Sequence, residues 1–215
     1  IAIGAIAFLL IAGGAFYIVN ESEQVVITQF GKPVSDPITT PGLKIKKPFL
    51  ETANYFDKRF LAWDGEPKQV STRDKRFINI NTYARWRISD PLQYAKRLFD
   101  ESKALTRLGS VLEGATQNAI ANHDLIELVR SSNRDYVSNN VHSDQSKQEK
   151  AIIKSGRDEL TKEILELAKE STSDLGIEIL DFQFKRINYV PEVRKKVYER
   201  MISERKRIAE EFRSQ

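Results

Sequence analysis

The chain has 215 residues, of which 40% are apolar, and its 34 lysines and arginines exceed its 30 aspartates and glutamates to give a net charge of +4. This composition suits one or two modest globular domains. The sequence contains no cysteine, which excludes disulfides, zinc-thiolate sites and a cysteine nucleophile. The small, dispersed positive charge does not favour nucleic-acid binding. The chain does not start with methionine, so we expect it to be part of a longer protein.

The first segment, residues 1–19, contains no charged residue. As a helix that rises about 1.5 Å per residue, it would span roughly 28 Å, close to the thickness of the hydrocarbon core of a bilayer. We therefore expect a retained transmembrane anchor over 1–19. The alternative is a cleaved signal peptide, which the small residues Gly13, Gly14 and Ala15 favour. No lysine or arginine follows before Lys32, which favours a body outside the cytoplasm.

Two extended segments come next. Residues 24–30 are rich in β-branched side chains and run into Gly31, which predicts a strand followed by a turn. The dipeptide Pro41-Gly42 predicts a second turn.

The segment 43–50 mixes apolar residues with three lysines. Held near a bilayer, its apolar side chains could enter the headgroup layer while its lysines meet anionic lipid. On this hypothesis the candidate lipid contacts are Lys44, Lys46, Lys47, Phe49 and Leu50. The alternative is an ordinary strand pair with one solvated face, and the sequence leaves both open.

The clearest strand is predicted over residues 76–88, where apolar and polar side chains alternate with period two. Asp90-Pro91 predicts a capped helix start. Residues 103–122 have the apolar spacing of an amphipathic helix, and Asp124 with Glu127 predicts a capping box for a further short helix. The sheet is therefore expected to be packed by helices.

A polar stretch, residues 131–147, is expected to link to a helix over 148–175 that ends at Gly176. The alternation in residues 177–187 predicts a strand with one buried face. Taken with the earlier segments, these elements indicate an α+β fold.

A last helix is expected to begin at Pro191 and to continue to the end of the chain. It carries a stripe of apolar residues that we propose as the candidate subunit contact: Val193, Val197, Met201, Ile208 and Phe212. Their spacing is looser than that of a left-handed coiled coil, so the pattern establishes only an amphipathic helix. The stripe would be covered either by neighbouring chains or by the domain of the same chain.

Nothing in the sequence indicates an enzyme. Its two histidines, His123 and His142, lie in no hydrolase or metalloprotease motif, and its glycines are scattered rather than gathered in a phosphate-binding loop. His123 beside Asp124 is more typical of a helix boundary than of a catalytic pair. We therefore expect no catalytic residue, no metal site and no cofactor.

Several stretches together resemble the stomatin/prohibitin (band 7, SPFH) family, and one bacterial member of it in particular. These are the stretches 23–33, 41–49, 74–91, 176–191 and 196–210. The resemblance implies an N-terminal membrane anchor, a two-part α/β domain and a long C-terminal helix that continues as a coiled coil. It places a first, mostly β subdomain at 20–90, a second, α/β subdomain at 91–190, and the start of the long helix at 191–215.

The same resemblance implies a function. It predicts a single-pass protein of the bacterial inner membrane with a periplasmic body, which joins an HflK-like paralogous subunit in a large hetero-oligomeric ring or cage. That assembly would enclose an FtsH-type AAA+ protease and regulate it. The alternative is a protein that organises membrane lipids without a protease partner.

Overall fold

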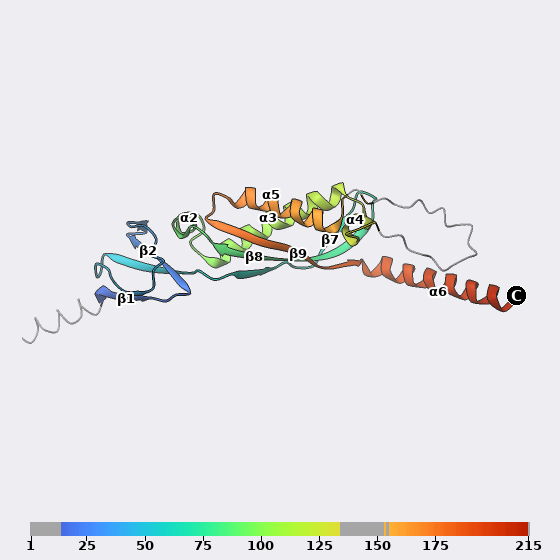
Figure 1. Ribbon diagram of the computed structural model, residues 1–215, viewed down its shortest axis with the longest axis horizontal. Helices are drawn as coiled ribbons and strands as arrows, with labels where there is room; N and C mark the ends of the chain where they lie inside the picture. The colour runs from blue at the N-terminus through green and yellow to red at the C-terminus, as the bar shows by residue number, and fades with distance from the viewer. Residues whose placement is uncertain (1–13, 134–152, 154, 215) are drawn as a thin grey trace, which may run out of the picture. The chain divides into compact units, whose positions relative to one another are not determined.

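The computed structural model describes residues 14–133, 153 and 155–214 (Figure 1). Its strands are β1 (Phe16–Val19), β2 (Glu23–Gln29), β3 (Lys32–Pro33), β4 (Gly42–Ile45), β5 (Glu51–Asp57), β6 (Leu61–Asp64), β7 (Lys68–Ser71), β8 (Phe77–Ile88) and β9 (Ile177–Tyr189). Its helices are α2 (Pro91–Arg97), α3 (Glu101–Asn122), α4 (Leu125–Val129), α5 (Arg157–Thr172) and α6 (Pro191–Ser214).

The chain divides into two compact units. Unit 1 comprises Ile1–Trp63, Ala84–Ala115 and Ile164–Phe182, and unit 2 comprises Asp64–Tyr83, Thr116–Glu163 and Gln183–Gln215. The division passes through β8, α3, α5 and β9, so each of these long elements contributes one segment to each unit. The subdomain boundaries expected at residues 90 and 190 stay a prediction.

The last residues of the expected transmembrane anchor form a strand. Phe16–Val19 are β1, which pairs antiparallel with β4 and places Phe16 opposite Ile45 and Val19 opposite Gly42. Aromatic and β-branched side chains suit a strand, and β4 supplies the partner that no local pattern reveals. Helical structure therefore does not extend to residue 19 as expected. None of the helices in the described part is long and apolar enough to cross a membrane. Residues 1–13 lie outside that part, so the anchor stays a prediction.

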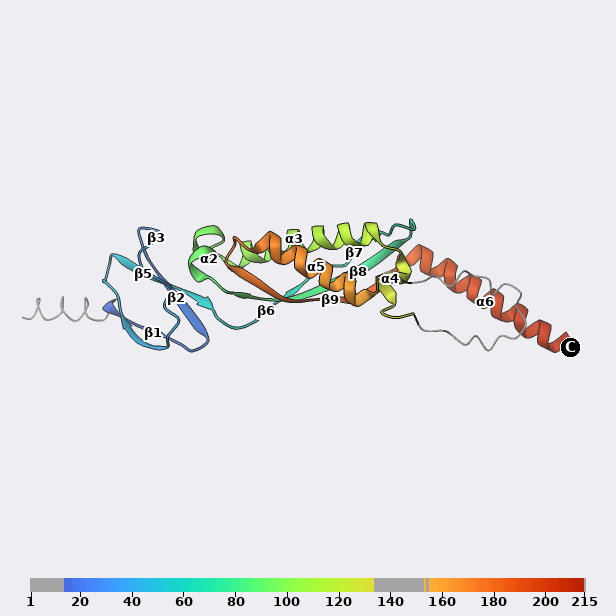
Figure 2. The same cartoon turned by 45° about the horizontal axis from the view of Figure 1, so that its top comes forward.

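Unit 1 contains a three-stranded sheet in the order β3-β2-β5 beside the two-stranded β1–β4 ribbon (Figure 2). The predicted strand near 24–30 is confirmed as β2, which is antiparallel to β5. A small core between the two sheets is formed by Tyr17, Val19, Val25 and Ile27. The buried amide of Gln24 donates a hydrogen bond of 3.1 Å to the carbonyl of Ile88, which ties the start of β2 to the end of β8.

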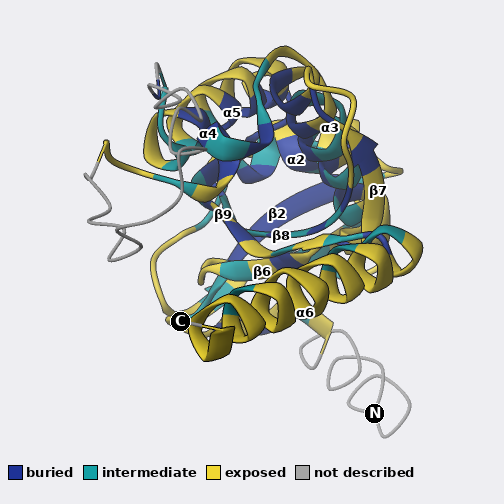
Figure 3. Cartoon of the chain, turned by 90° about the vertical axis from the view of Figure 1, so that its right-hand side faces the viewer, coloured by how far each residue is buried: buried dark blue, intermediate teal, exposed yellow. Residues whose placement is uncertain are grey.

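The predicted long strand is confirmed as β8, which pairs with β6 and β7 and also with β9. Its alternate residues from Ile78 to Ile88 are buried, including Trp86 with no exposed surface. Helices α3 and α5 lie on one side of β8 and β9, with buried residues turned toward the sheet (Figure 3). The expected packing of helices on a sheet is therefore observed.

Most of the predicted helix boundaries are confirmed. The Asp90 carboxylate accepts hydrogen bonds from the backbone N–H groups of Leu92 and Gln93, and Pro91 opens α2. Gly176 has a φ of 73° and ends the segment after α5. The expected helix start near residue 148 is wrong, because α5 begins at Arg157. The apolar side chain of Ile153, which suggested an earlier start, is buried in non-helical backbone whose N–H donates to the Asn133 side chain at 2.9 Å.

Candidate interaction surfaces

The β1–β4 ribbon has one buried and one exposed face. Tyr17 and Val19 are in the core, whereas Phe16 and Ile18 point outward. Phe16 is paired with Ile45 and Ile18 with Leu43, and all four are exposed, so they form a continuous apolar surface. We call Phe16, Ile18, Leu43 and Ile45 the ribbon face. Exposed apolar residues that adjoin one another typically mark a contact with another molecule.

Two loop tips in unit 1 add further apolar side chains. The β2–β3 turn consists of Phe30 and Gly31, which have φ values of 50° and 80° between the paired residues Gln29 and Lys32. Phe49 has a φ of 67° in the loop between β4 and β5. Phe30 is 85% exposed and Phe49 is 87% exposed, and Leu50 next to it is also exposed. We call Phe30, Phe49 and Leu50 the tip residues.

The structure brings the predicted lipid contacts into one region but separates the lysines from the apolar residues. Lys44 is opposite Tyr17, on the other face of the ribbon from Leu43 and Ile45, and its Nζ donates to the Thr40 hydroxyl at 3.0 Å. Its neighbour along the chain, Lys46, donates to the backbone carbonyl of Glu51 at 3.3 Å.

The third lysine of this segment, Lys47, forms an ion pair with Glu51. The closest distance between the Lys47 Nζ and the Glu51 carboxylate is 3.6 Å, and the Lys47 side chain is 72% exposed. The exposed surface of this region is therefore mainly apolar, with Lys47 as its most accessible cation among the three.

Sequence reasoning missed Phe30, Phe16 and Ile18 as surface residues. Phe16 and Ile18 were assigned to the anchor because their apolar character fits a membrane helix as well as a strand face. Phe30 was assigned to the end of a strand, and the Phe-Gly dipeptide before Lys32 was the available signal for a two-residue hairpin turn.

Helix α6 has an apolar face that the described part of the chain covers only in part. None of its residues, from Pro191 to Ser214, is buried against the described part of the chain. The predicted contact residues Val193, Val197 and Ile208 are half-buried, and Met201 and Phe212 are exposed. The charged residues form pairs along the helix, such as Arg200 Nε with Glu204 Oε1 at 2.9 Å. Tyr198 and Ile202, which the spacing argument left out, are also exposed and widen the apolar face.

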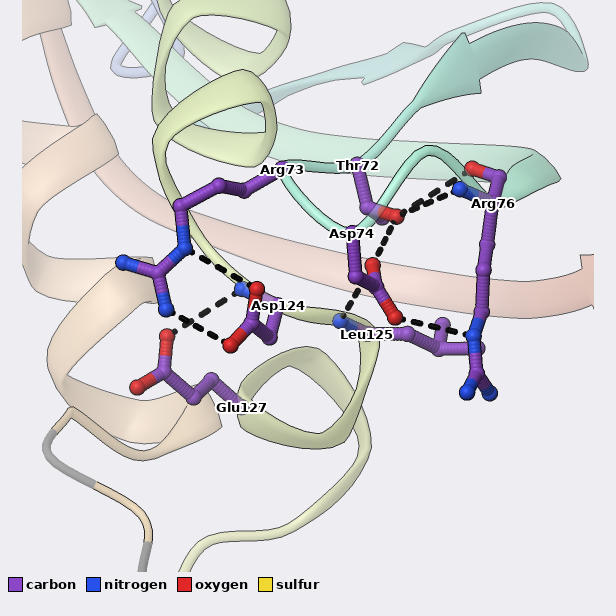
Figure 4. Close-up of polar contacts among 7 residues, drawn as sticks. All are labelled: Thr72, Arg73, Asp74, Arg76, Asp124, Leu125 and Glu127. Atoms are coloured by element: carbon purple, nitrogen blue, oxygen red, sulfur yellow. Dashed lines mark hydrogen bonds and ion pairs between the residues drawn. The ribbon is translucent and has the colours of Figure 1, made fainter. Parts of the chain in front are cut away.

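A polar cluster in unit 2 joins the β7–β8 turn to the start of α4 (Figure 4). Arg73 binds Asp124 through two hydrogen bonds, Nε to Oδ1 at 2.9 Å and Nη2 to Oδ2 at 2.6 Å. The backbone N–H of Leu125 donates to Asp74 Oδ1 at 3.3 Å, and that of Asp124 donates to Glu127 Oε2 at 3.3 Å. The pairing of Asp124 with Glu127 at the start of this helix confirms the predicted capping box.

The electrostatics of this cluster follow from its geometry. The hydrogen bond from Arg73 lowers the pKa of the Asp124 carboxyl, and the positive charge of Arg73 acts in the same direction. Sequence reasoning missed Arg73 and Asp74 because their partners are 51 residues away.

The residues considered for catalysis have structural roles or lie outside the described part. His123, directly after α3, has its Nδ1 2.7 Å from the carbonyl of Ala119 in the last turn of that helix, and Asp124 is bound to Arg73. His142 lies in the segment 134–152 that the structure does not describe. Within the residues that it does describe, no three His, Asp or Glu side chains converge in a metal-binding group.

The fold and the sequence also match known proteins. The model of the SPFH domain / Band 7 family matches residues 17–215. The chain belongs to the SPFH domain / Band 7 family. The resemblance to the band 7 family is thereby confirmed, and the bacterial member that the motifs resemble is HflC. Membership of this family confirms the expectation that the chain is not itself an enzyme.

Three relatives show how far the similarity extends. Protein HflC of Borreliella burgdorferi is 38% identical over 204 residues, which are 92% of this chain and 63% of that protein. Protein HflC of Treponema pallidum is 32% identical over 99% of the chain and 69% of its own length. The Escherichia coli K12 protein described as "Modulator of FtsH protease HflC" is 28% identical over 98% of the chain and 70% of its own length. The SPFH chain thus spans roughly two thirds of these relatives.

Proposed function

We propose that this chain is a scaffold subunit at the bacterial inner membrane that modulates an FtsH-type AAA+ protease. On this proposal it crosses the membrane once, keeps its body in the periplasm, and assembles with an HflK-like paralogous subunit into a ring or cage around the protease. The observation that carries the proposal is the similarity, over nearly the whole chain, to HflC proteins of which one is described as a modulator of FtsH.

The uncovered face of α6 supports the assembly step. No residue of this amphipathic helix is buried against the described part of the chain, so its apolar side chains stay partly or largely in water unless another chain covers them. We propose that Val193, Val197, Met201, Ile208 and Phe212 meet the corresponding helix of a neighbouring subunit. The charged residues on the remaining surface of the helix keep that other side in contact with water.

The assembly step is tested by placing charges on the stripe. In the V197D/M201D double variant, each contact would bury carboxylates without partners, which costs several kcal/mol per charge. We expect small particles in mild detergent with an unchanged thermal unfolding transition. The matched control is S203D/K206Q, which makes the same change in net charge on the charged face of α6 and should leave large particles intact. Large particles from V197D/M201D would contradict the proposed contact.

The partnership with the protease is tested by co-purification. We expect FtsH to be recovered with the chain from gently solubilised membranes, and to stay with it after bulk lipid is exchanged. A second candidate function, lipid organisation without a protease, is favoured by the exposed ribbon face and tip residues. It predicts that no FtsH remains once the lipid is exchanged.

A further inference from the structure

A buried polar side chain lies at the start of β2. Gln24 is 3% exposed, although the residues that follow it in the strand are apolar. Its side-chain amide donates two hydrogen bonds, one of 3.1 Å to the Ile88 carbonyl and a longer one of 3.4 Å to the Asp57 carbonyl. Burial of an amide is unfavourable unless its hydrogen bonds are made, and an apolar side chain would pack here without that requirement. The amide therefore indicates that a specific arrangement of strand ends is held in place.

The residue opposite Gln24 contacts a different element. Phe56 of β5 is the cross-strand partner of Gln24, so both side chains project from the same face of the sheet. The ring of Phe56 packs edge-to-face against Tyr94 of α2, with ring centroids 5.3 Å apart and an interplanar angle of 76°. Tyr94 is buried. This one cross-strand pair thus binds the end of β8 through an amide and α2 through a ring.

The elements that receive this pair are held to one another. The carbonyl of Gly176, just before β9, accepts hydrogen bonds from the backbone N–H groups of Ser89 at 3.0 Å and Asp90 at 3.1 Å. The Asp90 side chain in turn caps α2. We call the end of β8, the start of α2 and Gly176 the seat. The seat and the β3-β2-β5 sheet both belong to unit 1.

The covalent connection from this sheet to the next strand is short and makes contacts at both of its ends. Residues 58–60 separate β5 from β6. The backbone N–H of Lys58 donates to the Ser22 carbonyl at 2.8 Å, beside the start of β2. The guanidinium of Arg87, on β8, lies 5.9 Å from the centroid of the Phe60 ring, within the range of a cation–π contact. The connection therefore differs from a flexible linker, which makes no such contacts.

We propose that Gln24 and Phe56 form a rigid joint that holds the β3-β2-β5 sheet in one orientation on the seat. A displacement of this sheet then moves the ends of β8 and α2 with it, instead of being absorbed by a hinge at residues 58–60. The two contacts complement each other, because hydrogen bonds fix direction and packed rings resist separation. This inference concerns the conformation of unit 1 and goes beyond the protease and assembly steps of the proposed function.

The test measures distances between spin labels across the joint by double electron–electron resonance. Because the sequence contains no cysteine, T52C/K103C places one label on β5 and one on α3, at exposed positions of unit 1. The reference pair K103C/K169C places both labels on exposed positions of helices α3 and α5 in the same unit. Labelled full chain in mild detergent is diluted with unlabelled chain, so that only distances within one chain contribute.

Q24M removes both side-chain hydrogen bonds and keeps a side chain of similar length. We expect the T52C/K103C distance distribution to be narrow with Gln24 in place and to broaden in Q24M, while the K103C/K169C distribution stays unchanged. The matched control is Q29M, which makes the same substitution at the other end of β2, where Gln29 is half-buried. It should leave both distributions narrow.

Three results would overturn the proposal. The first is a T52C/K103C distribution that is already broad with Gln24 in place, and the second is one that is as narrow in Q24M as in Q29M. The third is broadening of both label pairs in Q24M, which would show that Gln24 supports the whole unit rather than a joint. If Q24M fails to fold, F56L decides, because it keeps an apolar side chain and removes only the ring contact with Tyr94. F56L should broaden the T52C/K103C distribution alone, and an unchanged distribution would overturn the joint.

Discussion

Strand β8 and helix α6 both have periodic apolar patterns, but their surroundings are opposite. In β8 the alternate residues from Ile78 to Ile88 are buried, whereas α6 has no buried residue against the described chain. Periodicity therefore shows which face of an element is apolar, but not what covers that face. In β8 the cover comes from the same chain, and in α6 we propose that it comes from another.

The sharpest way to test the comparison is to remove a large side chain from β8. Trp86→Ala deletes a fully buried ring, and we expect it to lower the free energy of unfolding by about 3–5 kcal/mol through lost burial and the cavity left behind. Urea unfolding followed by circular dichroism measures the loss. Trp86→Phe should cost much less, because in the described structure the Trp86 Nε1 group has no hydrogen-bond partner to lose. Equal losses in the two variants would contradict this reasoning.

Two glycines with positive φ, Gly176 and Gly31, allow a covered site and an exposed site to be compared at the level of the backbone. A Cβ at Gly176 would clash with the Asp90 carbonyl oxygen and would lie 2.7 Å from the Tyr94 nitrogen, so Gly176→Ala adds a clash with backbone to the strain. We expect a loss of about 3 kcal/mol. Gly31, at the exposed tip, has no atom within 4 Å of such a Cβ, and Gly31→Ala should cost only about 1 kcal/mol. Thermal unfolding that ranks the two in reverse would contradict the assigned surroundings.

The counterpart of Trp86→Ala on α6 should have almost no effect on the fold. Met201 is exposed, so Met201→Ala in the dissociated chain should change the free energy of unfolding by less than about 0.5 kcal/mol. The measurement is urea unfolding in detergent after the assembly has been dispersed. A loss as large as that of a buried residue would show that α6 packs on its own chain.

The smallest expected effect is the acid sensitivity of the polar cluster. Arg73 lowers the pKa of Asp124, so the pair contributes stability above the ordinary aspartate pKa, and this contribution is lost as pH falls through the lowered folded-state pKa. Asp124→Asn removes the charge but keeps a good helix cap. Stability measured against pH should show a gap between wild type and Asp124→Asn at neutral pH that closes in acid. A gap that widens in acid would contradict the pairing with Arg73.

Local rules predicted much of the fold because they act between near neighbours in sequence. The Asp90-Pro91 start of α2, the Asp124–Glu127 pairing and the positive φ of Gly176 each depend on a few consecutive residues. The alternation in β8 and the amphipathic pattern of α6 likewise depend only on the spacing of apolar residues along the sequence. These features could be predicted from the sequence without knowledge of any distant partner.

What sequence analysis missed depends on residues that are distant along the chain. Phe16–Val19 became a strand because β4 pairs with it, and the same letters would suit a membrane helix in the absence of that partner. Arg73 and Asp74 reach the start of α4 from a loop 51 residues earlier. The sequence of each of these segments is compatible with several environments. Only the tertiary structure selects one of them, because the partners that complete the hydrogen bonds and the burial are distant along the chain and are not specified by the local sequence pattern.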